Sequence, residues 1–118
     1  MSDEIAGPNE PVPNELRILA AEENLGELRS VHSPASFMAR LAFRRSRVYL
    51  YRNGFVLANP RGGLGLFRFD QVTATLRGAA LSVQRADGAS FLLLTRHWTD
   101  GEALGRTIEE SVTGTTGG

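Results

Sequence analysis

Four arginines gather within eight residues of this sequence, at a spacing suited to binding a phosphate group. A guanidinium group donates two parallel hydrogen bonds to one phosphate and stays charged at physiological pH. Each cation near an anionic surface contributes about 1 kcal/mol of binding free energy, so four arginines contribute about 4 kcal/mol. This corresponds to a Kd of about 1 mM, which is too weak to hold the protein on a membrane by itself. A solvated loop that keeps the protein soluble explains the same residues. The cluster comprises Arg40, Arg44, Arg45 and Arg47.

Tyr49 and Tyr51 follow the cluster at alternate positions of a predicted strand. Aromatic rings interleaved with cations can stack nucleic-acid bases. A formal net charge of zero and acidic ends argue against nucleic acid, so we expect an exposed Tyr49/Tyr51 face to contact a protein. The interleaved cations are Arg47, Arg52, Arg61 and Arg68.

Residue types that support metal or nucleophilic chemistry are scarce. The chain has no cysteine, and His32 and His97 stand 65 positions apart. A zinc site needs three or more N, S or carboxylate ligands, and Asp70 has no evident Ser-His or Cys-His pair to complete a triad. The glycines at 62, 63 and 65 lack the Lys-Ser/Thr of a phosphate-binding loop. We therefore expect no catalytic residue, no metal and no cofactor.

Charge is segregated along the chain. Residues 1–27 hold seven acidic residues and one arginine, whereas residues 28–99 hold eleven arginines and two aspartates. Residues 100–118 hold four acidic residues and one arginine. The basic middle could steer anionic partners, or the acidic ends could fold back over it.

The first thirteen residues are acidic, contain three prolines, and lack the basic and apolar regions of a signal peptide. No stretch approaches the roughly 18 apolar residues of a membrane span. The absence of cysteine fits a reducing compartment. We expect a soluble cytoplasmic protein with mobile tails at residues 1–13 and 114–118.

Hydrophobic periodicity and turn residues predict two helices and seven strands. Asn14 is expected to cap a helix from Glu15 to about Asn24, and Thr99 with Glu102 to form the capping box of a second helix from Asp100 to Val112. In residues 34–46, Phe37, Met38, Leu41 and Ala42 show helical spacing, but the stretch is only about three turns long and is treated as a loop with helical or extended character. The strands are expected at Glu27–His32, Arg47–Arg52, Phe55–Ala58, Leu64–Phe69, Val72–Leu76, Leu81–Arg85 and Ser90–Thr95.

Two short turns predict hairpins. Asn53-Gly54 favours a type I′ turn, in which both central residues take positive φ, and Asp87-Gly88 favours a second hairpin. The apolar run 91–94 indicates a strand buried on both faces. Trp98, just before the last helix, is expected to be buried and structural.

This order of elements, seven strands and then a helix, resembles that of the pleckstrin-homology (PH) superfold. In residues 47–94 a hairpin with alternating tyrosines precedes the turn Phe67-Arg68-Phe69-Asp70-Gln71-Val72, a pattern similar to that of uncharacterised bacterial PH-like families. The resemblance implies an α+β, mostly β fold: a seven-stranded antiparallel roll or barrel over residues 26–113, capped by one helix. The short helix expected from the sequence itself, at 14–25, precedes this domain.

The resemblance also implies a binding module rather than an enzyme. Where such folds bind phosphoinositides, the first hairpin carries a Lys/Arg-x-Arg step, matched here by Arg45-Ser46-Arg47. The favoured hypothesis is recognition of a protein partner through the groove between the last helix and a sheet edge, or through Tyr49 and Tyr51. The alternative is peripheral contact with an anionic membrane headgroup, whose affinity should fall steeply with salt.

Overall fold

The computed structural model describes residues 13–42, 45–59 and 63–117, in which three helices and seven strands form an α+β fold. Two short 3₁₀ turns, η1 (Phe69–Gln71) and η2 (Thr95–His97), follow β4 and β7. The helices are α1 (Asn14–Glu22), α2 (Phe37–Ala42) and α3 (Gly101–Gly117). The strands are β1 (Leu28–His32), β2 (Arg47–Tyr51), β3 (Gly54–Asn59), β4 (Gly63–Arg68), β5 (Val72–Arg77), β6 (Ala80–Arg85) and β7 (Ser90–Leu94).

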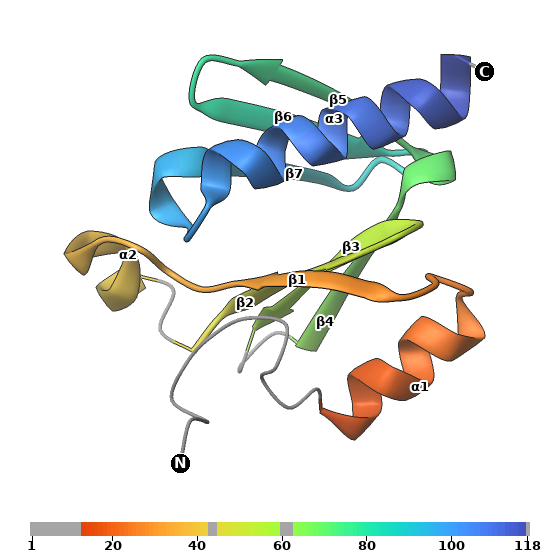
Figure 1. Ribbon diagram of the computed structural model, residues 1–118, viewed down its shortest axis with the longest axis horizontal. Helices are drawn as coiled ribbons and strands as arrows, with labels where there is room; N and C mark the ends of the chain where they lie inside the picture. Colours follow the sequence, from red (N-terminus) through yellow and green to blue (C-terminus); the bar gives the residue numbers. More distant parts are fainter. Residues whose placement is uncertain (1–12, 43–44, 60–62, 118) are drawn as a thin grey trace.

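The strands form two separate antiparallel sheets. The first sheet has the order β1-β2-β3-β4 and the second the order β5-β6-β7 (Figure 1). The chain passes from one to the other through η1, and no strand ladder joins them in the described part of the chain. The expected closure into a single barrel is therefore wrong, whereas the expected strands and the last helix are confirmed to within one or two residues, apart from the C-terminal extension of α3.

The main core lies where the two sheets and α3 meet. The apolar stripe of α3, formed by Leu104, Ile108 and Val112, is buried there, and Trp98 is buried as predicted. Phenylalanines from both sheets pack together in this core, with the Phe55 and Phe67 rings stacked at 4.9 Å. The sheets are thus held by side-chain packing where backbone pairing is missing.

Arg85 on β6 is a polar connection between the sheets. Its guanidinium donates to the carbonyl of Leu66 on β4 and lies 5.2 Å above the centre of the Phe67 ring. The same side chain pairs with Asp87 at 3.0 Å. One arginine therefore contacts both sheets near the corner made by η1.

A second core lies on the opposite face of the first sheet, beneath α1. Leu16 and Ala20 of α1 pack there against Val31, Val56 and the two tyrosine rings. Tyr49 and Tyr51 are each only 4% exposed. The prediction of an exposed tyrosine face is wrong, because α1 covers the face that alternation along β2 assigned to solvent.

The β2–β3 hairpin forms, but its turn differs from the prediction. Tyr51 pairs with Gly54, so the turn residues are Arg52 and Asn53, and neither has positive φ. A Cβ at Gly54 would lie 2.6 Å from the Phe67 carbonyl oxygen. Gly54 is thus required by the close approach of β4, not by a left-handed backbone. The Asp87-Gly88 hairpin is confirmed, with Gly88 at φ 99°.

Both predicted helix caps are wrong. Pro13, not Asn14, precedes the first turn of α1, and no side chain caps it. Thr99 Oγ1 instead accepts the backbone N–H of Ser33 at 3.1 Å. The segment that precedes α3 is thereby joined to the residue that follows β1, a contact between distant segments that local spacing does not reveal.

Two further predictions, for β7 and for residues 34–46, differ from the structure. The predicted burial of both faces of β7 fails at Leu92, which is 60% exposed, because it lies with its exposed β6 neighbour Ser82 on the face of the second sheet that points away from the core. Residues 37–42, within the stretch treated as a loop, form α2, whose first turn is capped by Ser36 Oγ accepting the N–H of Ala39.

Candidate functional site

The connection between β1 and β2 is attached firmly to the segment that precedes α3. Pro34 forms an isolated bridge with Trp98, the N–H of Ala35 donates to His97 at 2.8 Å, and the N–H of Thr99 donates to Ser33 at 2.9 Å. These bonds hold the chain on both sides of a surface pocket. The backbone beneath the pocket is therefore held in place by hydrogen bonds.

The pocket has a volume of about 390 Å³ and is lined by three of the four predicted arginines. Arg40 comes from α2, Arg45 from the turn before β2, and Arg47 from the first position of β2. The fourth, Arg44, lies outside the described residues. We call this site the arginine pocket; its other lining residues are Ser33, Pro34, Ala35 and Thr99.

The arginine pocket concentrates positive charge. None of the described residues that line it is acidic. Across the described part of the chain, no carboxylate forms an ion pair with Arg40 or Arg45, and both side chains belong to exposed residues. Arg47 Nη1 donates to the carbonyl of Ser46 at 2.8 Å, which orients its guanidinium. Three fork-shaped donors around one cavity suit a tetrahedral oxyanion.

Arg45 has φ 66°, a left-handed backbone that side-chain-bearing residues seldom adopt. Arg45 lies in the turn immediately before β2. We note that arginine has no local hydrogen bond of the kind that helps Asn or Asp tolerate this region.

His32 lies close to the arginine pocket, at the end of β1. Its Nδ1–H donates to the carbonyl of Thr99 at 2.6 Å, which leaves Nε2 to accept the hydroxyl of Ser30 at 2.8 Å. Burial lowers the pKa of the ring, opposed by the Thr99 carbonyl and the charge of Asp100. His32 is therefore a neutral structural residue that fixes the Thr99 segment.

The tyrosines predicted for the same site are placed elsewhere. Tyr49 and Tyr51 lie beneath α1, on the other side of the first sheet. Burial raises the pKa of Tyr51, partly offset by the charge of Arg17. The structure thus brings Arg40, Arg45 and Arg47 together and separates them from both tyrosines.

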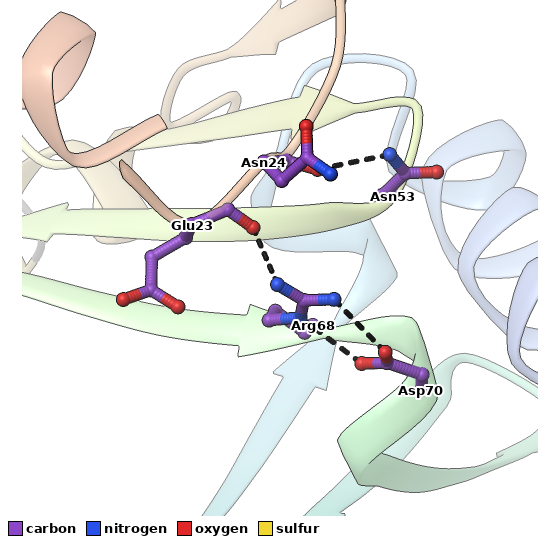
Figure 2. Close-up of polar contacts among 5 residues, drawn as sticks. All are labelled: Glu23, Asn24, Asn53, Arg68 and Asp70. Carbon is purple, nitrogen blue, oxygen red and sulfur yellow. Dashed lines mark hydrogen bonds and ion pairs between the residues drawn. The ribbon is translucent and has the colours of Figure 1, made fainter. Parts of the chain in front are cut away.

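A second cavity, of about 370 Å³, lies beside the β2–β3 turn and contains Arg52 and Arg68. Here Arg68 already has an acidic partner. Arg68 forms a bidentate pair with Asp70 and also donates to the carbonyl of Glu23, while the Asn53 amide donates to the carbonyl of Asn24 (Figure 2). Hydrogen bonding to Arg68 lowers the pKa of Asp70. This network connects the end of α1 to the first sheet and is less suited to bind an anion.

Sequence reasoning missed the polar backbone around the arginine pocket. Ser33 and Thr99 are 66 positions apart and meet only because β1 continues alongside the Trp98 segment. The arginines themselves could be identified from the sequence because they are close together in the chain.

Metal-binding clusters and membrane-spanning helices are both missing from the described residues. No group of three His, Cys, Asp or Glu side chains is placed to hold a metal ion. Among the helices described, none combines the length and apolarity needed to cross a membrane.

The chain was also compared with known proteins. No family model, no curated protein and no solved structure matches it.

Proposed function

We propose that this chain is a non-catalytic PH-like module that binds phosphate-bearing anions at the arginine pocket. The observation that carries the proposal is the convergence of Arg40, Arg45 and Arg47 on one cavity with no acidic residue among its described lining. Support for a PH-like fold is the order of four strands, three strands and a C-terminal helix. The arginine pocket lies in the connection before and at the start of β2, where the PH resemblance expects a basic motif.

The probe for this proposal is inorganic pyrophosphate, titrated while the arginine Nε–H signals are followed by NMR. We expect the signals of Arg40, Arg45 and Arg47 to shift together, with a Kd of about 1 mM. Changing all three to Ser should weaken binding at least tenfold.

The matched control removes the same charge from other exposed positions. Arg77, Arg96 and Arg106 lie on β5, on η2 and on α3, outside the arginine pocket. Their combined change to Ser should leave pyrophosphate affinity nearly unchanged. Equal loss in both triple variants would mean that only net charge matters, and the proposal would fail.

A second candidate is recognition of an extended protein segment at the outer edge of β5, beside α3. Glu109 Oε2 on α3 accepts the backbone N–H of Leu76 at 2.9 Å, so this edge presents donors toward the helix. Because N–H directions alternate along a strand, the N–H of Ala74 also points away from β6. An added strand would use such groups.

The change Ala74→Pro tests the second candidate, because proline removes an outer-edge donor without removing a bond to β6. If a protein partner pairs with this edge, the variant should lose salt-resistant capture of that partner from host lysate while keeping pyrophosphate binding. Capture that is unaffected by Ala74→Pro would contradict it.

A further inference from the structure

α2 presents an unusual amount of apolar side chain to solvent. Phe37 is 72% exposed, Met38 69% and Leu41 62%, and they are three of the five large apolar residues that are exposed among the described residues. The other two, Ile18 and Leu92, stand singly on α1 and β7. Single exposed apolar residues are ordinary, whereas a contiguous group marks a surface that contacts something.

The three side chains share one face of the helix. Positions 37, 38 and 41 are related as i, i+1 and i+4, and Ala39, which points the other way, is only 1% exposed. Ser36 caps the first turn, with its Oγ 3.1 Å from the N–H of Ala39. The apolar face is thus held outward by a capped helix that lies toward the opposite end of the long axis from α1 (Figure 1).

Arg40 connects this apolar face to the arginine pocket. It belongs to α2 and lines the cavity together with Arg45 and Arg47. Apolar side chains and phosphate-binding cations therefore stand side by side. An anionic lipid surface offers the complementary pair at one boundary, acyl chains below and phosphates above, and amphipathic helices with basic flanks bind there.

Other occupants match this surface less well. A free phosphate gains nothing from Phe37, Met38 and Leu41. A second copy of the chain, pairing α2 with α2 about a two-fold axis, would bring each arginine pocket toward its own counterpart, and like charges would repel.

We propose that α2 inserts its apolar face into an anionic membrane surface while the arginine pocket binds lipid phosphates. This inference rests on the proposed phosphate binding and assigns its source. Arginine contact and apolar insertion together would provide an attachment that the arginines alone are too weak to give.

The test is co-sedimentation of the full chain with vesicles of phosphatidylcholine alone or with added phosphatidylglycerol. We expect binding only to the anionic vesicles. The variant Phe37→Ser/Met38→Ser/Leu41→Ser should bind them about tenfold more weakly, yet titrate with pyrophosphate like the wild type. The variant Arg40→Ser/Arg45→Ser/Arg47→Ser should lose both interactions.

The matched control for the apolar change is Ile18→Ser/Leu92→Ser, which removes exposed apolar residues away from α2 and should sediment like the wild type. A Phe37→Trp variant supplies a depth probe. Lipids brominated in their acyl chains should quench the introduced indole, whereas Trp98, 5% exposed in the core, should stay unquenched.

Three results would overturn the inference. The first is equal sedimentation of the apolar variant and the wild type, and the second is absence of quenching at position 37. The third is binding to a phosphorylated peptide with none to vesicles. In each case a normal pyrophosphate titration would leave the proposed phosphate binding standing, whereas loss of that titration in the wild type would remove the proposed function itself.

Discussion

Gly54 begins β3 at a place where three segments approach one another. A Cβ at this position would lie 2.6 Å from the Phe67 carbonyl oxygen and 3.1 Å from Leu25 Cδ2. The first neighbour is backbone and cannot rotate away. Glycine is needed here for space, although its φ is not positive.

We predict that Gly54→Ala destabilises the protein by about 2 kcal/mol, the usual effect of overpacking a closed site. Urea unfolding followed by circular dichroism measures it. The control is Gly114→Ala in α3, where an added Cβ meets nothing within 4 Å. That change should be neutral or stabilising by about 0.5 kcal/mol, since alanine favours helix. A Gly54→Ala variant as stable as the wild type would contradict the expected clash.

His32 gives the protein a predictable response to acid. Its ring is buried and neutral, with both nitrogens hydrogen-bonded, and its pKa is lowered from the ordinary value of 6.5. Below that value the unfolded chain takes up a proton that the folded chain refuses. The contribution of the neutral His32 ring to the free energy of unfolding is therefore fully present above about pH 6.5. It is lost as the pH falls toward the lowered pKa of the folded state.

We predict that the free energy of unfolding declines as the pH falls below about 6.5, and that His32→Asn flattens this decline. Asparagine keeps a donor for the Thr99 carbonyl but does not titrate. His97→Gln is the control and should retain the wild-type decline. An unchanged decline in His32→Asn would assign the effect to another group.

At the scale of elements, the two sheets depend on side chains at the corner where strand pairing stops. Arg85 reaches from β6 to the Leu66 carbonyl and to the face of Phe67. A lysine would keep the charge but lose the planar fork that makes both contacts and the pair with Asp87.

We predict that Arg85→Lys lowers the free energy of unfolding by about 1–2 kcal/mol. Arg77→Lys on β5, an exposed position, serves as the control and should change stability by less than about 0.5 kcal/mol. Thermal unfolding of the two variants beside the wild type gives the comparison. Equal melting temperatures would mean that packing alone joins the sheets.

The strands were predictable because alternation and turn residues are local signals. In β5, for example, the more apolar residues Val72, Ala74 and Leu76 alternate with polar ones and are the less exposed set. The predictions that proved wrong concern features that depend on contacts between distant segments. Tyr49 and Tyr51 follow the alternation of a half-exposed strand, but α1 covers their face.

The candidate site divides in the same way. Arg40, Arg45 and Arg47 could be singled out from spacing, whereas their shared cavity depends on the pairing of Pro34 with Trp98. The helical spacing of Phe37, Met38 and Leu41 was visible in the sequence. Their exposure was not, because the same spacing is usual for a helix packed on a core.

At the scale of the whole molecule, segregated charge matters more than the formal net charge of zero. Most of the arginines lie in the middle of the chain, and the acidic residues are concentrated toward its ends. The field around such a protein depends on where its charges are, and salt screens that field over about 8 Å at physiological ionic strength.

We predict that Asp3→Asn/Glu4→Gln/Glu10→Gln raises affinity for pyrophosphate severalfold at low salt and little at high salt. Titrations at two ionic strengths measure this. The comparison variant Glu102→Gln/Glu110→Gln removes acidic charge from exposed positions of α3 instead of from the start of the chain. Affinity unchanged at low salt would show that the acidic start of the chain has no electrostatic influence on the arginine pocket.

The β2–β3 turn has a consequence for engineering. The N–H of Asn53 donates to Leu25, its carbonyl accepts from Phe69, and its amide donates to Asn24. A tag, a reporter domain or new termini made by circular permutation would break these three connections at once. The turn at Gly78, where an added Cβ meets nothing within 4 Å, is the better place to open the chain.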